Sequence, residues 1–167
     1  MSDQDTSNSG LYVAAYFSDE TNQNIAKYLS DNKIPNPIKS PGFHTTVVYS
    51  RVPVADFEPN HSIGIEVDTK GSTIEGWDVP SGTRCLVWHY ESNYLHLRFQ
   101  EAMAAGATYD FDEYKPHISL SYDVGNDFDV AALPVPNFPI YLMGEYSEPI
   151  ELEYEIEEDI FENLFAK

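Results

Sequence analysis

Two short segments of the chain repeat one pattern, a histidine followed two positions later by a hydroxyl residue. They are His44-Thr45-Thr46 and His117-Ile118-Ser119. Both lie in apolar, β-branched runs, 43–49 and 116–122, which predict β-strands. Because a strand turns alternate side chains to opposite faces, each histidine should project on the same face as its hydroxyl residue. Two such strands side by side would bring two imidazoles and two hydroxyls to one point.

This set of side chains suits proton transfer to and from a phosphodiester. An imidazole titrates near neutral pH, so one histidine can remove a proton while the other supplies one. The hydroxyls can donate hydrogen bonds to the phosphate oxygens as charge develops on them. The remaining histidines lack a hydroxyl two positions later; they are His61, His89 and His96. We interpret His89, which lies in a predicted strand, as structural.

The length and the charge of the chain limit its partners. Its 167 residues are enough for one domain with a substantial core and too few for two ordinary domains. The formal net charge of −19 argues against a long nucleic-acid partner, because proteins that bind a phosphate backbone present basic stripes. A small anionic ligand is compatible with this charge if cations gather locally. We expect Lys39, Arg51 and Lys115 to lie near the two histidines and the acids to lie elsewhere.

Cysteine content and hydropathy favour a cytosolic protein. Cys85 is the only cysteine, so there is no internal disulfide, and its apolar neighbours predict an inert, buried thiol. No stretch approaches the roughly 20 apolar residues that span a bilayer, and the N-terminus lacks the apolar part of a signal peptide. We therefore expect no membrane association, and we predict no obligate protein partner.

The elements predicted from periodicity repeat in the same order in two halves of the chain, about 11–70 and 84–156. Each half has a strand, a helix and then the strand that carries the histidine. A shift of 73 residues places His44 on His117, although few residues are identical across the shift. We expect a flexible N-terminal tail, residues 1–9, and a single two-lobed domain over 10–167. Each lobe contributes one histidine strand to a central cleft.

The two predicted helices have clear boundaries. The first runs over about 20–30, with Ser18 or Asp19 as its N-cap. The second begins after Ser92 and ends at Gly106, because glycine readily adopts the backbone conformation that terminates a helix. The apolar stripe predicted for the second helix consists of Leu95, Phe99 and Met103.

The C-terminal segment is strongly acidic. Apolar and glutamate residues alternate over 149–156, which predicts a half-buried strand with an acidic outer face. A short helix is predicted over 157–165, because acidic residues suit a helix N-terminus. We interpret the acidic surface as a solubilising face, and a docking strip for a basic partner is the alternative.

The paired motifs, their spacing and the two-lobed order resemble the 2H phosphoesterase superfamily and, within it, the small phage anti-CBASS nucleases, over about residues 10–156. The closer resemblance is carried by Tyr12, Phe43-His44-Thr45-Thr46 and Lys115-Pro116-His117-Ile118-Ser119. It implies an α+β, two-lobed fold in which antiparallel sheets line a central cleft and helices lie outside. It also implies metal-independent hydrolysis, without any cofactor, of 3′–5′ bonds in cyclic di- and trinucleotide immune signals such as 3′3′-cGAMP. A phage would use this activity in the host cytoplasm to evade bacterial CBASS defence.

The resemblance assigns roles to individual residues. His44 and His117 become the general acid–base pair of a reaction that passes through a 2′,3′-cyclic phosphate. Thr46 and Ser119 become hydrogen-bond donors to the scissile phosphate. The substrate-binding residues implied by the resemblance are Tyr12 and Trp77 for stacking on bases and Glu145 for accepting a base amino group. Lys115 is added to them because it lies two residues before His117.

Two other functions remain open at this point. An acidic domain could mimic nucleic acid and inhibit a basic host enzyme, which accounts for the charge but leaves the paired motifs as coincidence. Another activity of the 2H type, on RNA ends or on 2′,3′-cyclic phosphates, is the third alternative. The acidity counts against long RNA as the substrate.

Overall fold

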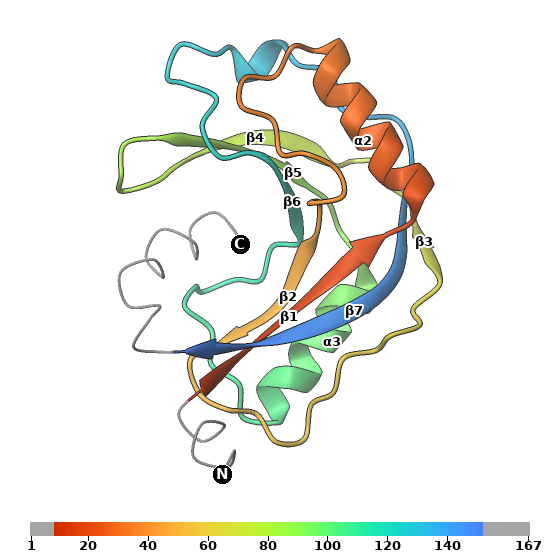
Figure 1. Ribbon diagram of the computed structural model, residues 1–167, viewed down its shortest axis with the longest axis vertical. Coiled ribbons are helices and arrows are strands. Elements are labelled where there is room, and N and C mark those ends of the chain that lie inside the picture. The colour runs from red at the N-terminus through yellow and green to blue at the C-terminus, as the bar shows by residue number, and fades with distance from the viewer. Residues whose placement is uncertain (1–8, 152–167) are drawn as a thin grey trace.

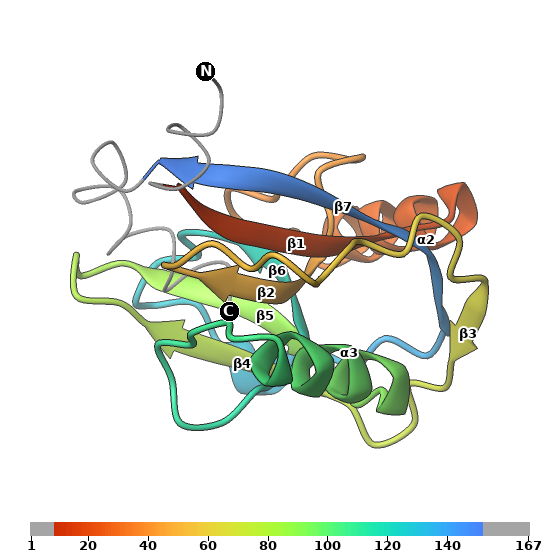
Figure 2. The same cartoon turned by 90° about the horizontal axis from the view of Figure 1, so that it is seen from below.

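Two antiparallel sheets and two helices make up the part of the protein that the computed structural model describes, residues 9–151. The first sheet has the order β2-β1-β7-β3, with bounds Thr45–Ser50, Ser9–Phe17, Ile140–Glu151 and Ile65–Val67. The second has the order β4-β5-β6, with bounds Thr73–Asp78, Arg84–His89 and His117–Ser121. Figure 2 shows the sheets as two layers, with β7, β1 and β2 above β5 and β4.

Each helix leads to one of the two motif strands, β2, which directly follows His44, and β6, which begins at His117. Helix α2 (Asp19–Asp31) joins β1 to β2, and helix α3 (Asn93–Ala104) joins β5 to β6 (Figure 1). The predicted N-caps Ser18 and Ser92 are confirmed, because each hydroxyl accepts a backbone N–H of the first turn at 3.2 Å. A single 3-10 turn, Val130–Ala132, lies between β6 and β7. Within residues 9–151, no helix has the length and apolar character that crossing a membrane requires.

The apolar stripe predicted for α3 is only partly correct. Leu95 is fully buried, but Met103 is 38% exposed. The helix instead directs Tyr94 and Arg98 toward β7, where a buried carboxylate accepts hydrogen bonds from both. Leaving a buried carboxylate without hydrogen-bond donors would cost more free energy than leaving one methionine partly exposed.

The last described strand starts earlier than the sequence predicts. Alternation predicted a strand from residue 149, whereas β7 begins at Ile140 and is described as far as Glu151. The rest of the acidic strand, the helix predicted over 157–165 and most of the predicted N-terminal tail lie outside the described residues. β4 was not predicted at all, since Gly76 and Asp78 on one of its faces obscure the alternation.

The two histidine strands are edge strands of different sheets, and they contact each other. In Figure 1 β2 and β6 lie side by side near the centre of the molecule. Side chains bridge the two sheets here: Thr45 Oγ1 and Tyr90 Oη are 2.6 Å apart, and Tyr114 Oη donates to the Thr46 carbonyl at 2.7 Å. One apolar core continues across both sheets. Close packing of that core fixes the relative position of β2 and β6.

Candidate active site

The first motif gathers around Tyr12 on β1. His44 directly precedes β2, and Thr46 is its second residue. The Tyr12 ring lies edge-on to the His44 ring with 6.3 Å between centroids, and Tyr12 Oη is 3.4 Å from Thr46 Oγ1. The shared neighbour places the imidazole and the hydroxyl on one face of the sheet, as the spacing predicts.

The second motif lies against Trp77 and Cys85. The His117 ring is 4.6 Å from the Trp77 ring, centroid to centroid, and Ser119 hydrogen-bonds the Cys85 thiol. Trp77 and Cys85 are opposite each other in the β4–β5 register, so His117 and Ser119 also share a face. Cys85 is buried, as predicted, and burial raises the pKa of its thiol to about 12 despite that hydrogen bond, so the thiol is protonated at neutral pH.

Both imidazoles are held through the same atom. Nδ1 of His44 lies 3.2 Å from the carbonyl oxygen of Gly42, and Nδ1 of His117 lies 2.8 Å from that of Lys115. A carbonyl oxygen can only accept, so in each neutral imidazole the proton is on Nδ1. Nε2 is then the nitrogen that takes up or releases a proton during chemistry. The two motifs thus have the same tautomer, fixed by the same backbone contact two residues earlier.

The environment of His44 favours its neutral form. Burial lowers the pKa of His44 below its ordinary value, although the bond to Gly42 and the negative charge of Glu148 oppose the shift. Glu148 lies opposite Tyr12 in the β1–β7 register and therefore faces the same side. A neutral imidazole at pH 7 is able to act as a general base.

Tyr12 is the centre of a tyrosine cluster that reaches both sheets. Its ring lies 5.9 Å from that of Tyr49 and 6.3 Å from that of Tyr146. Burial, followed by the proximity of Tyr146, raises the pKa of Tyr12 well above its ordinary value, and Tyr122, just after β6, contributes to the shift. Tyr12 is therefore a neutral phenol. It can donate to Thr46 Oγ1, which leaves the Thr46 hydroxyl hydrogen for a ligand.

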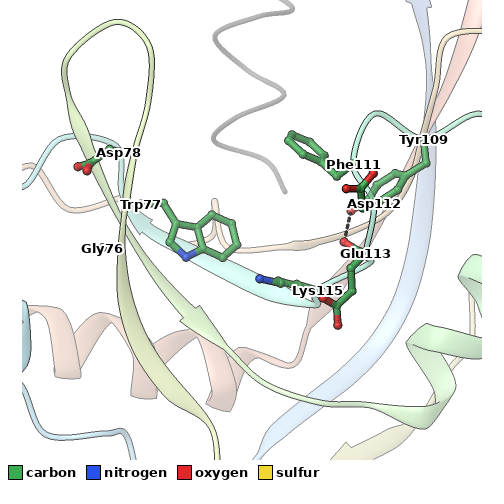
Figure 3. Close-up of a pocket in the computed structure, with 8 residues that line it drawn as sticks. All are labelled: Gly76, Trp77, Asp78, Tyr109, Phe111, Asp112, Glu113 and Lys115. Atoms are coloured by element: carbon green, nitrogen blue, oxygen red, sulfur yellow. Dashed lines mark hydrogen bonds between the residues drawn. The ribbon is translucent and has the colours of Figure 1, made fainter.

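A pocket of about 580 Å³ lies beside the second motif (Figure 3). Trp77 forms one wall, Phe111 and Tyr109 come from the opposite side, and the Lys115 side chain points between them. The volume is in the range typical of small-molecule sites. Aromatic walls beside a cation suit a nucleobase attached to a phosphate.

The expected separation of charges is not found. The charged residues that line the pocket are Lys115 and the acids Asp78, Asp112 and Glu113. Arg51 is paired with Asp110 at 2.8 Å, and Lys39 is exposed in the loop before the first motif. Of the three expected cations, only Lys115 lines this pocket. Asp112 and Glu113 lie in the same loop as Lys115, so this loop brings negative and positive side chains to the pocket together.

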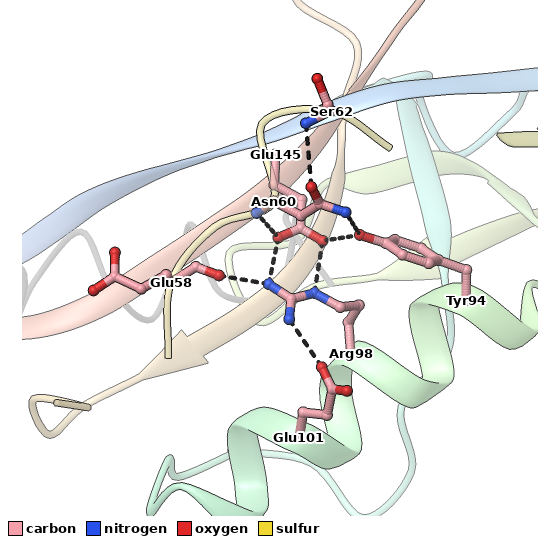
Figure 4. Close-up of polar contacts among 7 residues, drawn as sticks. All are labelled: Glu58, Asn60, Ser62, Tyr94, Arg98, Glu101 and Glu145. Carbon is pink, nitrogen blue, oxygen red and sulfur yellow. Dashed lines mark hydrogen bonds and ion pairs between the residues drawn. The ribbon is translucent and has the colours of Figure 1, made fainter. Parts of the chain in front are cut away.

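Glu145, the residue expected to read a base, lies away from the two motifs. Its side chain is fully buried and accepts two hydrogen bonds from Arg98, at 2.8 and 3.0 Å (Figure 4). It also accepts from Tyr94 Oη at 2.7 Å and from the Asn60 backbone N–H at 2.8 Å. A buried carboxylate with donors on both oxygens anchors α3 to β7. The expectation for Glu145 is therefore corrected, and Glu148 is the β7 glutamate on the face of Tyr12.

Two polar residues beside the second motif were not expected in the site. His89 is the β5 partner of His117 in the sheet register, and Glu75 lies within hydrogen-bonding distance of both His89 and Trp77. The spacing of Glu75 and Trp77, two positions apart, would have indicated a shared face had β4 been predicted. Over residues 9–151, no group of three or more His, Cys, Asp or Glu side chains is arranged to hold a metal ion.

Comparison with known proteins gives a family and a fold. The family model described as "Anti-CBASS protein Acb1" matches residues 9–157. Curated relatives with that description include one from Salmonella phage S16, 42% identical over 146 residues, which cover 87% of this chain and 91% of the relative. Another, from Enterobacteria phage T4, is 39% identical over 145 residues and has the same coverage, 87% and 91%.

Among solved structures, E. coli LigT complexed with 3′-AMP is similar to this chain with a TM-score of 0.53. The two share 14% sequence identity, over 84% of this chain and 87% of that one. At such low identity the likeness concerns the fold alone. Together with the two antiparallel sheets, it confirms the predicted α+β fold with antiparallel sheets.

Proposed function

Because the chain belongs to the Acb1 family of anti-CBASS proteins, we propose that it is a phosphodiesterase that hydrolyses 3′–5′ bonds in cyclic di- and trinucleotide immune signals such as 3′3′-cGAMP. The observation that carries this proposal is the matched pair of imidazoles, each fixed through Nδ1 and each accompanied by a hydroxyl. Such a pair supplies the base and the acid that cleavage of a ribonucleotide phosphodiester requires. The enzyme would act in the cytoplasm of an infected bacterium and remove the signal on which CBASS defence depends.

The reaction proceeds in two steps. One imidazole removes the proton of the ribose 2′-hydroxyl, and the 2′ oxygen attacks the adjacent phosphorus. The other imidazole protonates the departing 5′ oxygen, so that the first product carries a 2′,3′-cyclic phosphate. Water then opens this ring with the proton transfers reversed, which leaves a 3′-phosphate. The lowered pKa of His44 favours it as the base of the first step, and His117 is then the acid.

Thr46 and Ser119 donate hydrogen bonds to the non-bridging oxygens of the scissile phosphate. Charge on these oxygens grows in the transition state, and one such donor is typically worth about 10²- to 10³-fold in rate. Tyr12 supports Thr46 by donating to its Oγ1. The scheme moves protons with imidazoles and balances charge with hydroxyls, so it requires no metal ion.

The bases are held by one aromatic ring beside each imidazole. Tyr12 lies next to His44 and Trp77 next to His117, so each ring offers a stacking surface close to the reacting phosphate. Stacking of a base on an aromatic side chain is worth about 1–3 kcal/mol. Lys115 supplies a cation in the pocket beside Trp77. Glu148 replaces Glu145 as the acceptor for a base amino group, because it shares the face of Tyr12.

One assay tests the proposal and its alternatives. The protein is incubated in EDTA with 3′3′-cyclic dinucleotides, cyclic trinucleotides and a linear oligoribonucleotide, beside a His44→Ala/His117→Ala variant. We expect the small rings to be opened to 2′,3′-cyclic phosphate and then 3′-phosphate products, and the double variant to be inactive. Preferential cleavage of the linear RNA, or ring opening that survives in the double variant, would contradict the proposal. No turnover, together with tight binding of a basic nuclease, would support a nucleic-acid mimic instead.

A further inference from the structure

Trp77 is held at the edge of the pocket by a carboxylate of its own strand. Its indole Nε1 donates to Glu75 Oε1 at 2.8 Å. Glu75 precedes Trp77 by two residues on β4, so both side chains project from the same face. The same Trp77 ring lies 4.6 Å from the His117 imidazole. Glu75 therefore contacts the aromatic residue that flanks a catalytic histidine.

Glu75 is itself fixed by two further donors on its other oxygen. Thr73 Oγ1 donates to Oε2 at 2.7 Å, and His89 Nδ1 lies 3.1 Å from the same atom. Burial raises the pKa of Glu75, but the hydrogen bonds from Thr73, Trp77 and His89 together outweigh it, and the pKa lies below its ordinary value. The ionised carboxylate accepts from all three groups at once.

His89 connects this arrangement to the strand of the second motif. Thr73, His89 and His117 are successive partners across β4, β5 and β6, so they lie in a row on one face of the sheet. His89 Nε2 is 3.3 Å from Glu91 Oε2, which places its imidazole between two carboxylates. The row fixes where the Glu75 carboxylate lies relative to the catalytic imidazole.

We propose that Glu75 is a positioning residue, which sets the plane of the Trp77 ring against the His117 imidazole and against the base that lies in the pocket. The substrate part of this inference rests on the proposed function. The χ2 torsion of a tryptophan is broad, so a ring without a bond at Nε1 can take several planes. An ionised acceptor holds the N–H about twice as strongly as a neutral one, which restricts the ring to one plane.

The negative charge of Glu75 should repel an anionic ligand in the neighbouring pocket. The pocket already has three acids against one lysine, and each phosphodiester of the substrate carries a negative charge. The repulsion from Glu75 must be offset by a favourable contribution of the same side chain. The two contributions have opposite effects on substrate affinity, and this difference allows them to be measured separately.

Two variants separate positioning from charge. Glu75→Gln removes the charge but keeps an amide oxygen that can accept the Trp77 N–H, whereas Glu75→Ala removes both. We expect Glu75→Ala to raise KM for a cyclic dinucleotide about tenfold, with a smaller change in kcat, although loss of the charge alone would lower KM. Glu75→Gln should restore most of the affinity. Glu66→Gln, at an exposed glutamate of β3, is the matched control and should change neither constant.

A second measurement needs no substrate. It therefore tests the role of Glu75 independently of whether the proposed function is correct. The chain has two tryptophans, and Trp88 donates its indole N–H to Ser72 Oγ at 2.9 Å, which makes it an internal reference. In Glu75→Ala the Trp77 indole N–H signal in NMR should shift and exchange faster with solvent, while that of Trp88 stays in place. An unchanged Trp77 signal, or equal KM values for the two Glu75 variants, would overturn the inference. A responsive Trp77 signal in a protein that cleaves no cyclic nucleotide would support the fixing of the ring and refute the proposed function.

Discussion

The two histidine motifs share one backbone geometry but have different surroundings. In both, Nδ1 meets the carbonyl two residues earlier, at 3.2 Å for His44 and 2.8 Å for His117. His44 lies half-buried just before β2, beside Tyr12. The Tyr12 hydroxyl hydrogen-bonds that of Thr46, the hydroxyl residue of the same motif. His117 lies within β6, is 2% exposed, and packs against an indole that a carboxylate holds.

The comparison distinguishes the contact that acid–base catalysis requires at both histidines from the neighbours that differ between them. The shared contact fixes which nitrogen titrates, and both steps of acid–base catalysis need that. Among the neighbours that are not shared, burial and Glu148 shift the pKa of His44 in opposite directions, and the aromatic neighbours determine which part of the ligand each imidazole meets. A change in the shared part should therefore abolish turnover, whereas a change in the neighbours should alter its pH dependence or the affinity.

The largest effect is expected from loss of either imidazole. His44→Ala or His117→Ala should lower kcat by about 10²- to 10⁴-fold, and the double variant should be little worse, because both groups act in the same step. Steady-state turnover of a cyclic dinucleotide measures this, with His61→Ala, at an exposed histidine, as the control. If one of the two histidines could be removed with little loss, the motifs would not be equivalent parts of one site.

A slightly smaller loss is expected from the hydroxyls. Thr46→Val and Ser119→Ala should each lower kcat by about 10²- to 10³-fold, because each removes one donor to the developing charge. Tyr12→Phe keeps the ring and removes only a long hydrogen bond of 3.4 Å, so its effect on kcat should be smaller than that of Thr46→Val. Equal losses in the two variants would mean that the phenol, rather than Thr46, contacts the phosphate.

The pH profile of kcat/KM tests the difference between the two imidazoles. Because burial lowers the pKa of His44 from 6.5, a base at this position stays neutral, and the rate is maintained, as the pH falls to values below 6.5. Glu148 opposes that shift, so Glu148→Gln should move the acid limb to still lower pH. An acid limb centred above pH 6.5 would contradict the assignment of His44 as the base.

The smallest expected effect is that of salt. With a net charge of −19 and three acids in the pocket, the protein repels an anionic ligand at long range. Between about 10 and 150 mM ionic strength the screening length falls from about 30 to 8 Å, so kcat/KM should rise by about two- to threefold. Proteins that bind phosphates with basic surfaces show the opposite trend. A steep fall with salt would indicate a cationic surface at the site.

Local rules made much of the site predictable from sequence. The spacing within His44-Thr45-Thr46 and His117-Ile118-Ser119 correctly placed each imidazole with its hydroxyl, because alternation along a strand involves only neighbouring residues. The same holds for Ser18 and Ser92, whose cap bonds span three residues. The resemblance carried by these motifs and by the order of the elements implied an α+β fold, and this fold is confirmed.

Features that depend on pairing between distant segments were not predictable in this way. Glu145 and Glu148 are both glutamates of β7, and only the register with β1 decides which one faces Tyr12. Arg51 was expected to be a cation for the ligand, but Asp110, 59 residues later, pairs with it. The residues next to Glu145, Glu148 and Arg51 in the sequence do not indicate which distant segment each of them contacts.

The central claim is that His44 and His117 act on one phosphorus. A crystal structure of the wild-type protein with a cyclic dinucleotide whose 2′-hydroxyls are methylated tests it most directly, because the blocked nucleophile keeps the ligand intact. We expect Nε2 of one imidazole to face the 2′-O-methyl group, which replaces the proton that this nitrogen would remove, and Nε2 of the other to lie within about 3.2 Å of the 5′ oxygen of the same phosphodiester. A complex in which the two imidazoles meet different phosphates, or only one of them meets the ligand, would contradict it.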